Sequence, residues 1–76
     1  MKPFAPILYV SFKARINRLL HNIKNVASTK VRDCYLAELK NIIFELSLYD
    51  DNSDVKSLLD YICNELNDMG IQCSLI

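Results

Sequence analysis

Apolar residues recur at intervals of three and four along most of this chain, in three runs separated by the turn-forming stretches "ASTK" and "YDDNSD". Such spacing places the apolar side chains on one face of an α-helix. The sequence has only one Gly and two Pro, so it lacks the turn residues of a many-stranded fold. We therefore expect an all-α fold: a small three-helix bundle with helices at about 6–26, 30–48 and 53–69, followed by a short C-terminal tail.

The length of 76 residues predicts a single helical domain, 1–76. A chain this short buries only about 60% of its unfolded surface, so small scaffolds often need disulfides, a metal or a partner. The cysteines Cys34, Cys63 and Cys73 form an odd set without a C-x-x-C pair, and the chain has one histidine. We expect free, mostly buried thiols in a reducing cytosol, with no metal site and no disulfide. Self-association or a protein partner is left as the source of added stability.

The first expected helix starts with Pro6 in its first turn, where the missing N–H costs nothing. Ser28 or Thr29 is expected to cap the second helix, and Asn52 or Ser53 the third. Gly70 stands where a left-handed C-cap belongs. The first and third helices each show one apolar stripe: Leu8, Phe12, Ile16, Leu19, Ile23 and Val26 in the first, and Val55, Leu59, Ile62, Leu66 and Met69 in the third.

The second expected helix is apolar on two sides, which is typical of a central element. Its main stripe is flanked by Leu36 and Ile43, and a three-helix bundle would leave the opposite side open. That side is our candidate homodimer or partner interface, with Asn41 as a polar residue that fixes register across a two-fold axis. The alternative is that "PFAPILYV" and the tail cover it within one chain. The main stripe contains Val31, Tyr35, Leu39, Ile42, Leu46 and Tyr49; the candidate interface contains Ala37, Asn41, Phe44, Leu48, Phe4 and Ile7.

Charge is divided unevenly along the chain, although the whole is formally neutral. Residues 1–32 hold seven Lys and Arg and no acid, whereas residues 33–76 hold two Lys and nine acids. One interpretation is a nucleic-acid-binding helix. The other is pairing between the basic helix and the acidic half, which the acidic last helix and the absence of a helix-turn-helix signature favour. The candidate nucleic-acid-binding residues are Lys13, Arg15, Arg18 and Lys24.

No motif of catalysis or cofactor binding is present. His21 is the one general base near neutral pH, and no Ser or Cys lies at a helical spacing from it that would make a nucleophile pair. The stretch "DDNSD" resembles the start of a calcium loop, but Val55 and Tyr61 stand where Gly and Glu are required. We expect no enzyme activity, no catalytic residue, no metal and no cofactor.

The amphipathic, cationic start fits an interfacial membrane helix in composition, but partner helices can bury its stripe, and no run reaches the ~18 apolar residues of a membrane span. We therefore expect a cytoplasmic protein with no membrane contact. The function that the sequence favours is a small regulatory or inhibitory module that binds a protein partner and itself as a homodimer. It would present acidic helices two and three, or an apolar groove left by "PFAPILYV". The alternative is a nucleic-acid-associated regulator that uses the basic first helix.

Overall fold

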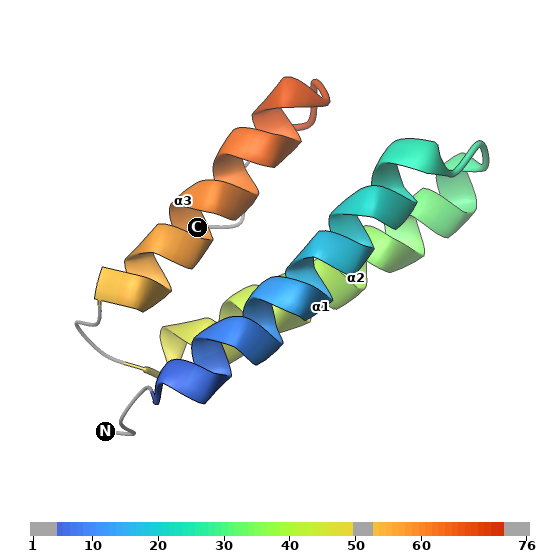
Figure 1. Cartoon of the computed structure of the whole chain (residues 1–76). Coiled ribbons are helices and arrows are strands. Elements are labelled where there is room, and N and C mark those ends of the chain that lie inside the picture. The colour runs from blue at the N-terminus through green and yellow to red at the C-terminus, as the bar shows by residue number, and fades with distance from the viewer. Residues whose placement is uncertain (1–4, 50–52, 73–76) are drawn as a thin grey trace.

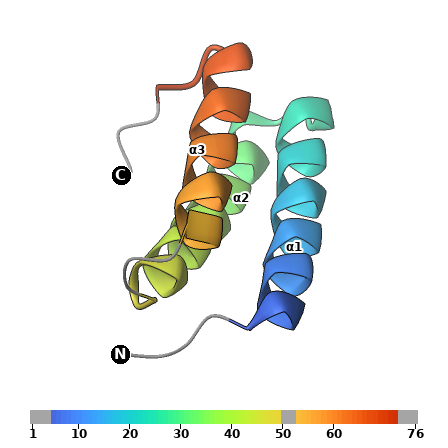
Figure 2. The ribbon, with the colours of Figure 1, turned by 60° about the vertical axis from the view of Figure 1, so that its left-hand side comes forward.

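The computed structural model describes residues 5–49 and 53–72. Three α-helices follow one another: α1 (Pro6–Asn25), α2 (Thr29–Ser47) and α3 (Ser53–Asp68). Consecutive helices run in opposite directions, so that α1 and α3 point the same way (Figures 1 and 2). The described residues contain no strand. The expectation of a small all-α bundle is therefore confirmed, and each helix begins and ends within one residue of its expected position.

Local chemistry explains where the helices begin and end. Pro6 opens α1, and the Ser28 hydroxyl accepts a hydrogen bond from the Val31 backbone N–H at 3.4 Å, which caps α2. After α3, Gly70 adopts a positive φ of 77°. The Ile71 N–H then reaches the Leu66 carbonyl at 2.8 Å and the Gly70 N–H reaches the Asn67 carbonyl at 3.0 Å, the pattern of a Schellman cap. Of the two expected caps of α3, Asn52 lies outside the described residues and Ser53 is the first residue of the helix.

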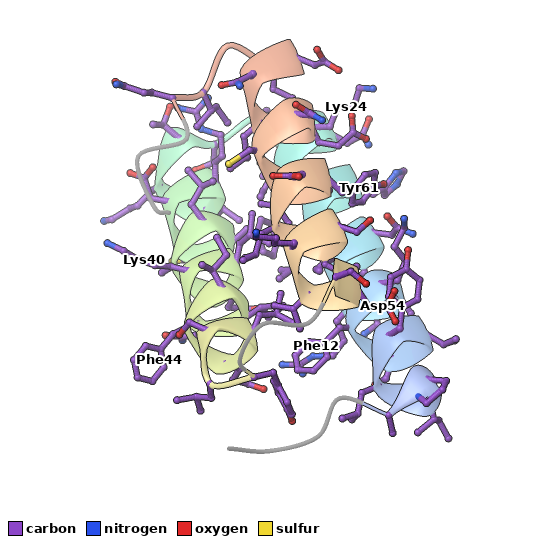
Figure 3. All side chains as sticks on the ribbon, turned by 90° about the vertical axis from the view of Figure 1, so that its left-hand side faces the viewer. Phe12, Lys24, Lys40, Phe44, Asp54 and Tyr61 are labelled. Atoms are coloured by element: carbon purple, nitrogen blue, oxygen red, sulfur yellow. The ribbon has the colours of Figure 1, made fainter. Side chains whose placement is uncertain are left out.

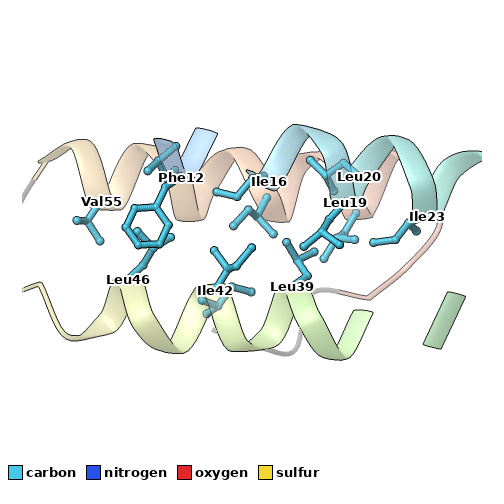
Figure 4. Packing of buried hydrophobic residues seen from close by; sticks show 13 residues of the cluster. Phe12, Ile16, Leu19, Leu20, Ile23, Leu39, Ile42, Leu46 and Val55 are labelled. Carbon is cyan, nitrogen blue, oxygen red and sulfur yellow. The ribbon is translucent and has the colours of Figure 1, made fainter. Parts of the chain in front are cut away.

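The core lies between the three helices and is entirely hydrophobic within the described chain (Figure 4). The expected stripes supply most of it, with two corrections. Leu20 and Leu58, which the stripes omitted, are buried, whereas Leu59 is only partly buried and Val31 is exposed. Tyr49 closes one end with its ring edge-on to Phe12, at 6.3 Å between centroids. The buried residues are Phe12, Ile16, Leu19, Leu20, Ile23, Leu39, Ile42, Ile43, Leu46, Val55, Leu58, Ile62 and Leu66.

The cysteines differ from the expectation of three free, mostly buried thiols. Cys34 is free, but it is exposed on α2. Cys63 on α3 is disulfide-bonded, so the prediction of a chain without a disulfide is wrong at this position. Cys73 lies outside the described residues. The spacing of the cysteines could not reveal the bond, because the pairing of cysteines cannot be deduced from sequence alone.

Candidate interaction surface on helix α2

The outer face of α2 carries a row of exposed side chains, Ala37, Asn41, Phe44 and Leu48, which we call the outer stripe. Residues two apart in a helix point about 200° from each other. Leu39 and Leu46 are completely buried. Asn41 therefore points away from the buried Leu39, and Phe44 points away from the buried Leu46. Phe44 is 66% exposed and Leu48 is 50% exposed. Figure 3 shows Phe44 directed away from both α1 and α3.

The bundle geometry explains why this stripe is uncovered. Both α1 and α3 pack on the inner side of α2, because the buried residues Leu39, Ile42 and Leu46 lie there. A fourth element would be needed to cover the outer side. Cys34, three residues before Ala37 and also exposed, extends the row toward the start of the helix. The row from Cys34 to Leu48 thus keeps the alternating spacing of three and four that helices use when they pack side by side.

The two flanks of the outer stripe differ in charge. On the α1 side, a shallow groove of about 300 Å³ is lined by two arginines of α1 and two glutamates of α2. There the Arg15 Nη2 lies 3.5 Å from the Glu45 Oε1, with both side chains about half exposed. On the α3 side, a groove of about 350 Å³ is lined by Asp33, Leu36, Ala37, Lys40, Leu66, Ile71 and Gln72. The stripe is therefore bordered by polar and charged groups on both sides, as the rim of an interface is.

Two other members of the candidate interface do not join this stripe. Ile7 is 76% exposed, and it precedes the buried Ile16 by nine residues, or about two and a half helical turns. It therefore lies on the outward side of α1. Val10, which is 67% exposed, is a near neighbour on that helix. Phe4 lies outside the described residues. Ile7 and Val10 therefore form a separate, smaller apolar patch on the outer side of α1. The sequence analysis, which described one apolar stripe on this helix, did not predict it.

The four basic candidates of α1 lie along both borders of its buried face. Lys13 is held over the Tyr61 ring of α3, with its Nζ 4.1 Å from the centroid, and the Tyr61 hydroxyl donates a hydrogen bond to the Asn17 Oδ1 at 2.6 Å. Lys24 lines a groove with Glu65 and Asp68 of α3. On the other border, the Arg15 and Arg18 side chains line the groove with Glu38 and Glu45 of α2.

This arrangement brings each border of the basic helix close to acidic residues. It favours pairing within the bundle, and between the described residues of α1 and α2 the Arg15 and Glu45 side chains reach ion-pair distance. A nucleic-acid-reading helix would gather its cations on one outward face instead. In α1, Lys13 and Lys24 instead lie beside α3, and Arg15 and Arg18 lie beside α2.

The distribution of acids corrects one expectation about the presented surface. Within its bounds, α2 carries three basic residues and three acidic residues, so it is not an acidic helix. The acidic surface belongs to α3, where Lys56 is the one cation against four acids: Asp54, Asp60, Glu65 and Asp68. The division of the sequence at residue 32 obscured this, because Lys30 and Arg32 belong to the first turn of α2 rather than to α1.

His21 is exposed on α1, where the Asn25 side-chain amide donates a hydrogen bond to its carbonyl oxygen at 2.8 Å. Among the described residues, no three His, Cys, Asp or Glu side chains gather closely enough to hold a metal ion. The three helices, over the part of the chain that the structure describes, are too short or too polar to cross a membrane. The most developed surface feature is therefore the outer stripe.

Comparison with known protein families, with curated proteins and with solved structures found no significant match to this chain.

Proposed function

We propose that this protein is a non-catalytic interaction module that binds another protein through the outer stripe of α2. The observation that carries the proposal is the exposure of Phe44 and Leu48 on a well-formed helix, in a row whose opposite side is completely buried. Exposed aromatic and aliphatic side chains in one row mark a binding surface more often than scattered apolar residues do. A regulatory or inhibitory effect would follow from occupying a surface of the partner.

The spacing of the outer stripe indicates the kind of partner. Side chains at intervals of three and four on a straight helix fit between the side chains of another helix. The expected partner surface is therefore an amphipathic helix that covers Phe44 and Leu48. The partner chain can be a different protein or, as expected from the sequence, a second copy of this chain. A cytoplasmic location, expected from the sequence, is kept in this proposal, although the disulfide at Cys63 is uncommon in that compartment.

The test is site-specific photo-crosslinking in cells that express the protein. A benzophenone amino acid replaces Ala37 in the outer stripe, and a matched variant carries it at Asp60, which is exposed on α3. Crosslinks to a protein chain are expected from position 37 alone, and Phe44→Glu should abolish them. Circular dichroism shows whether that variant remains helical. Identical products from both positions, or crosslinks that survive Phe44→Glu, would contradict the proposal.

A further inference from the structure

We infer that the occupant of the outer stripe is the same stripe of a second copy of this chain, with the two α2 helices packed antiparallel about a two-fold axis through Asn41. This inference rests on the proposed function and names its partner. In the described bundle, the outer stripe is a long row of exposed side chains along one face of α2. No other described helix covers this face. Three features of the stripe make it complementary to itself.

The first feature is side-chain size. When the axis passes through Asn41, residues whose numbers add up to roughly 82 face each other across the interface. Phe44, the largest side chain of the stripe, then meets Ala37, the smallest. Leu48 meets Cys34, which is exposed and free. A parallel pairing would instead place the two Phe44 rings against each other and leave a gap between the two small Ala37 side chains.

The second feature is the polar residue at the centre. Asn41 is exposed in the single chain, and its amide carries both donors and an acceptor. On the two-fold axis it meets its own copy, so each amide can donate to and accept from the other. A different apolar helix would leave this amide buried without a hydrogen-bond partner, which weakens such a contact. The central Asn therefore favours a second copy over an unrelated apolar helix.

The third feature is charge. An antiparallel pairing brings the α1-side flank of one copy against the same flank of the other in reversed order. Arg15, which pairs with Glu45 in its own chain, then lies beside Glu38 of the second copy. Arg18, which shares the groove with Glu38, lies beside Glu45 of the second copy. The four charges of each flank thus alternate in sign across the interface. On the other flank Lys40 meets its own copy, and its long side chain can extend into solvent.

The test begins with the mass of the purified full-length chain, measured by sedimentation velocity over a wide range of concentration. A concentration-dependent dimer is expected, and Phe44→Glu should weaken it by about a hundredfold or more, because two buried rings are lost and two charges are introduced. Ile7→Glu is the matched control, since Ile7 is more exposed than Phe44 but lies on the outward side of α1. It should leave the dimer unchanged. Circular dichroism checks that both variants keep their helices.

Disulfide trapping then tests the orientation. In the antiparallel pairing two Cys34 residues lie fourteen positions apart, roughly 21 Å along the helix, so mild oxidation should give no covalent dimer. A Cys34→Ser, Asn41→Cys variant should form one readily, because position 41 lies on the axis. Covalent dimers from both proteins would show a parallel pairing and overturn the inference.

A chain that stays monomeric at millimolar concentration would also overturn the inference, and so would a dimer that Phe44→Glu leaves intact. The proposed function fails by a separate result, namely the absence of any crosslink from position 37 that depends on Phe44. A monomer that still crosslinks to a different protein would therefore refute self-association alone.

Discussion

The two sides of α2 carry apolar residues at nearly the same intervals along one helix, yet one side is buried and the other is exposed. On the inner side, Leu39 and Leu46 have no exposed surface, whereas Phe44 and Leu48 on the outer side keep half or more of theirs. Among the described residues, the inner side meets two other helices and the outer side meets none. The spacing of apolar residues therefore shows which helix faces are suited to burial. Whether such a face is buried depends on how many other elements pack against the helix.

The largest expected effect comes from shortening an inner side chain. Leu46→Ala should lower the free energy of unfolding by about 2–5 kcal/mol, because it removes buried methyl groups and leaves a cavity. Urea denaturation at fixed protein concentration measures the loss. Leu48→Ala, on the half-exposed outer side, is the control and should lose far less. Equal losses would contradict the contrast between the two sides.

Because Leu46→Ala can unfold so small a chain, a milder variant keeps the contrast measurable. Ile42→Val should cost about 0.5–1.5 kcal/mol. The expected sign is the same, and the folded fraction remains large enough for an accurate denaturation curve.

A second change removes the polar interruption from the outer stripe. Asn41→Leu should tighten self-association by about tenfold, or ~1.4 kcal/mol, because apolar contact replaces a buried amide pair. It should also relax the preference for one register, so that Cys34 begins to form covalent dimers on oxidation. Sedimentation equilibrium and the oxidation assay measure these two effects. Unchanged or weaker association would show that Asn41 is not at the centre of an interface.

A third change tests whether the basic border of α1 is engaged with α2 or available to nucleic acid. Arg15→Ala with Arg18→Ala should lower the free energy of unfolding by about 0.2–1 kcal/mol, since the Arg15–Glu45 pair is half exposed. Little binding of a mixed-sequence duplex at near-physiological salt is expected from the parent protein, by fluorescence anisotropy. Tight binding whose steep salt dependence flattens in the double variant would instead support the nucleic-acid alternative.

The smallest effect is expected from the outer stripe in the monomer. At concentrations where the chain is monomeric, Phe44→Ala should change the free energy of unfolding by no more than about 0.5 kcal/mol, because Phe44 contributes little to the core of one chain. Thermal unfolding followed by circular dichroism at low protein concentration measures it. A loss comparable to that of Leu46→Ala would mean that Phe44 packs within its own chain.

The helices and their ends were predictable because their signals are local. A proline at the first turn, a serine cap and a glycine with positive φ each act within a few residues, and Pro6, Ser28 and Gly70 all do so in the structure. The exposure of the outer stripe was also foreseeable, since three helices cannot surround the middle one.

The interior of α3 and the surface contacts were less predictable. Val55 is followed by both Leu58 and Leu59, and either leucine continues a helical stripe, so the spacing could not show that Leu58 is buried while Leu59 is only partly buried. The Lys13–Tyr61 and Arg15–Glu45 contacts join residues of different helices. Their formation depends on the rotation of each helix, which the spacing of apolar residues defines only coarsely. Ile7 and Val10 form an outward patch that no described residue covers. The spacing of apolar residues therefore gave no reason to place them together.

The short connection between α1 and α2 has a kinetic consequence. Three residues, 26–28, separate the two helices, and these helices make the most extensive contact in the bundle. Closing so short a loop costs little chain entropy, so the α1–α2 hairpin should form first, with α3 adding later. Shortening Leu39 should therefore slow refolding, whereas shortening Leu58 should chiefly accelerate unfolding.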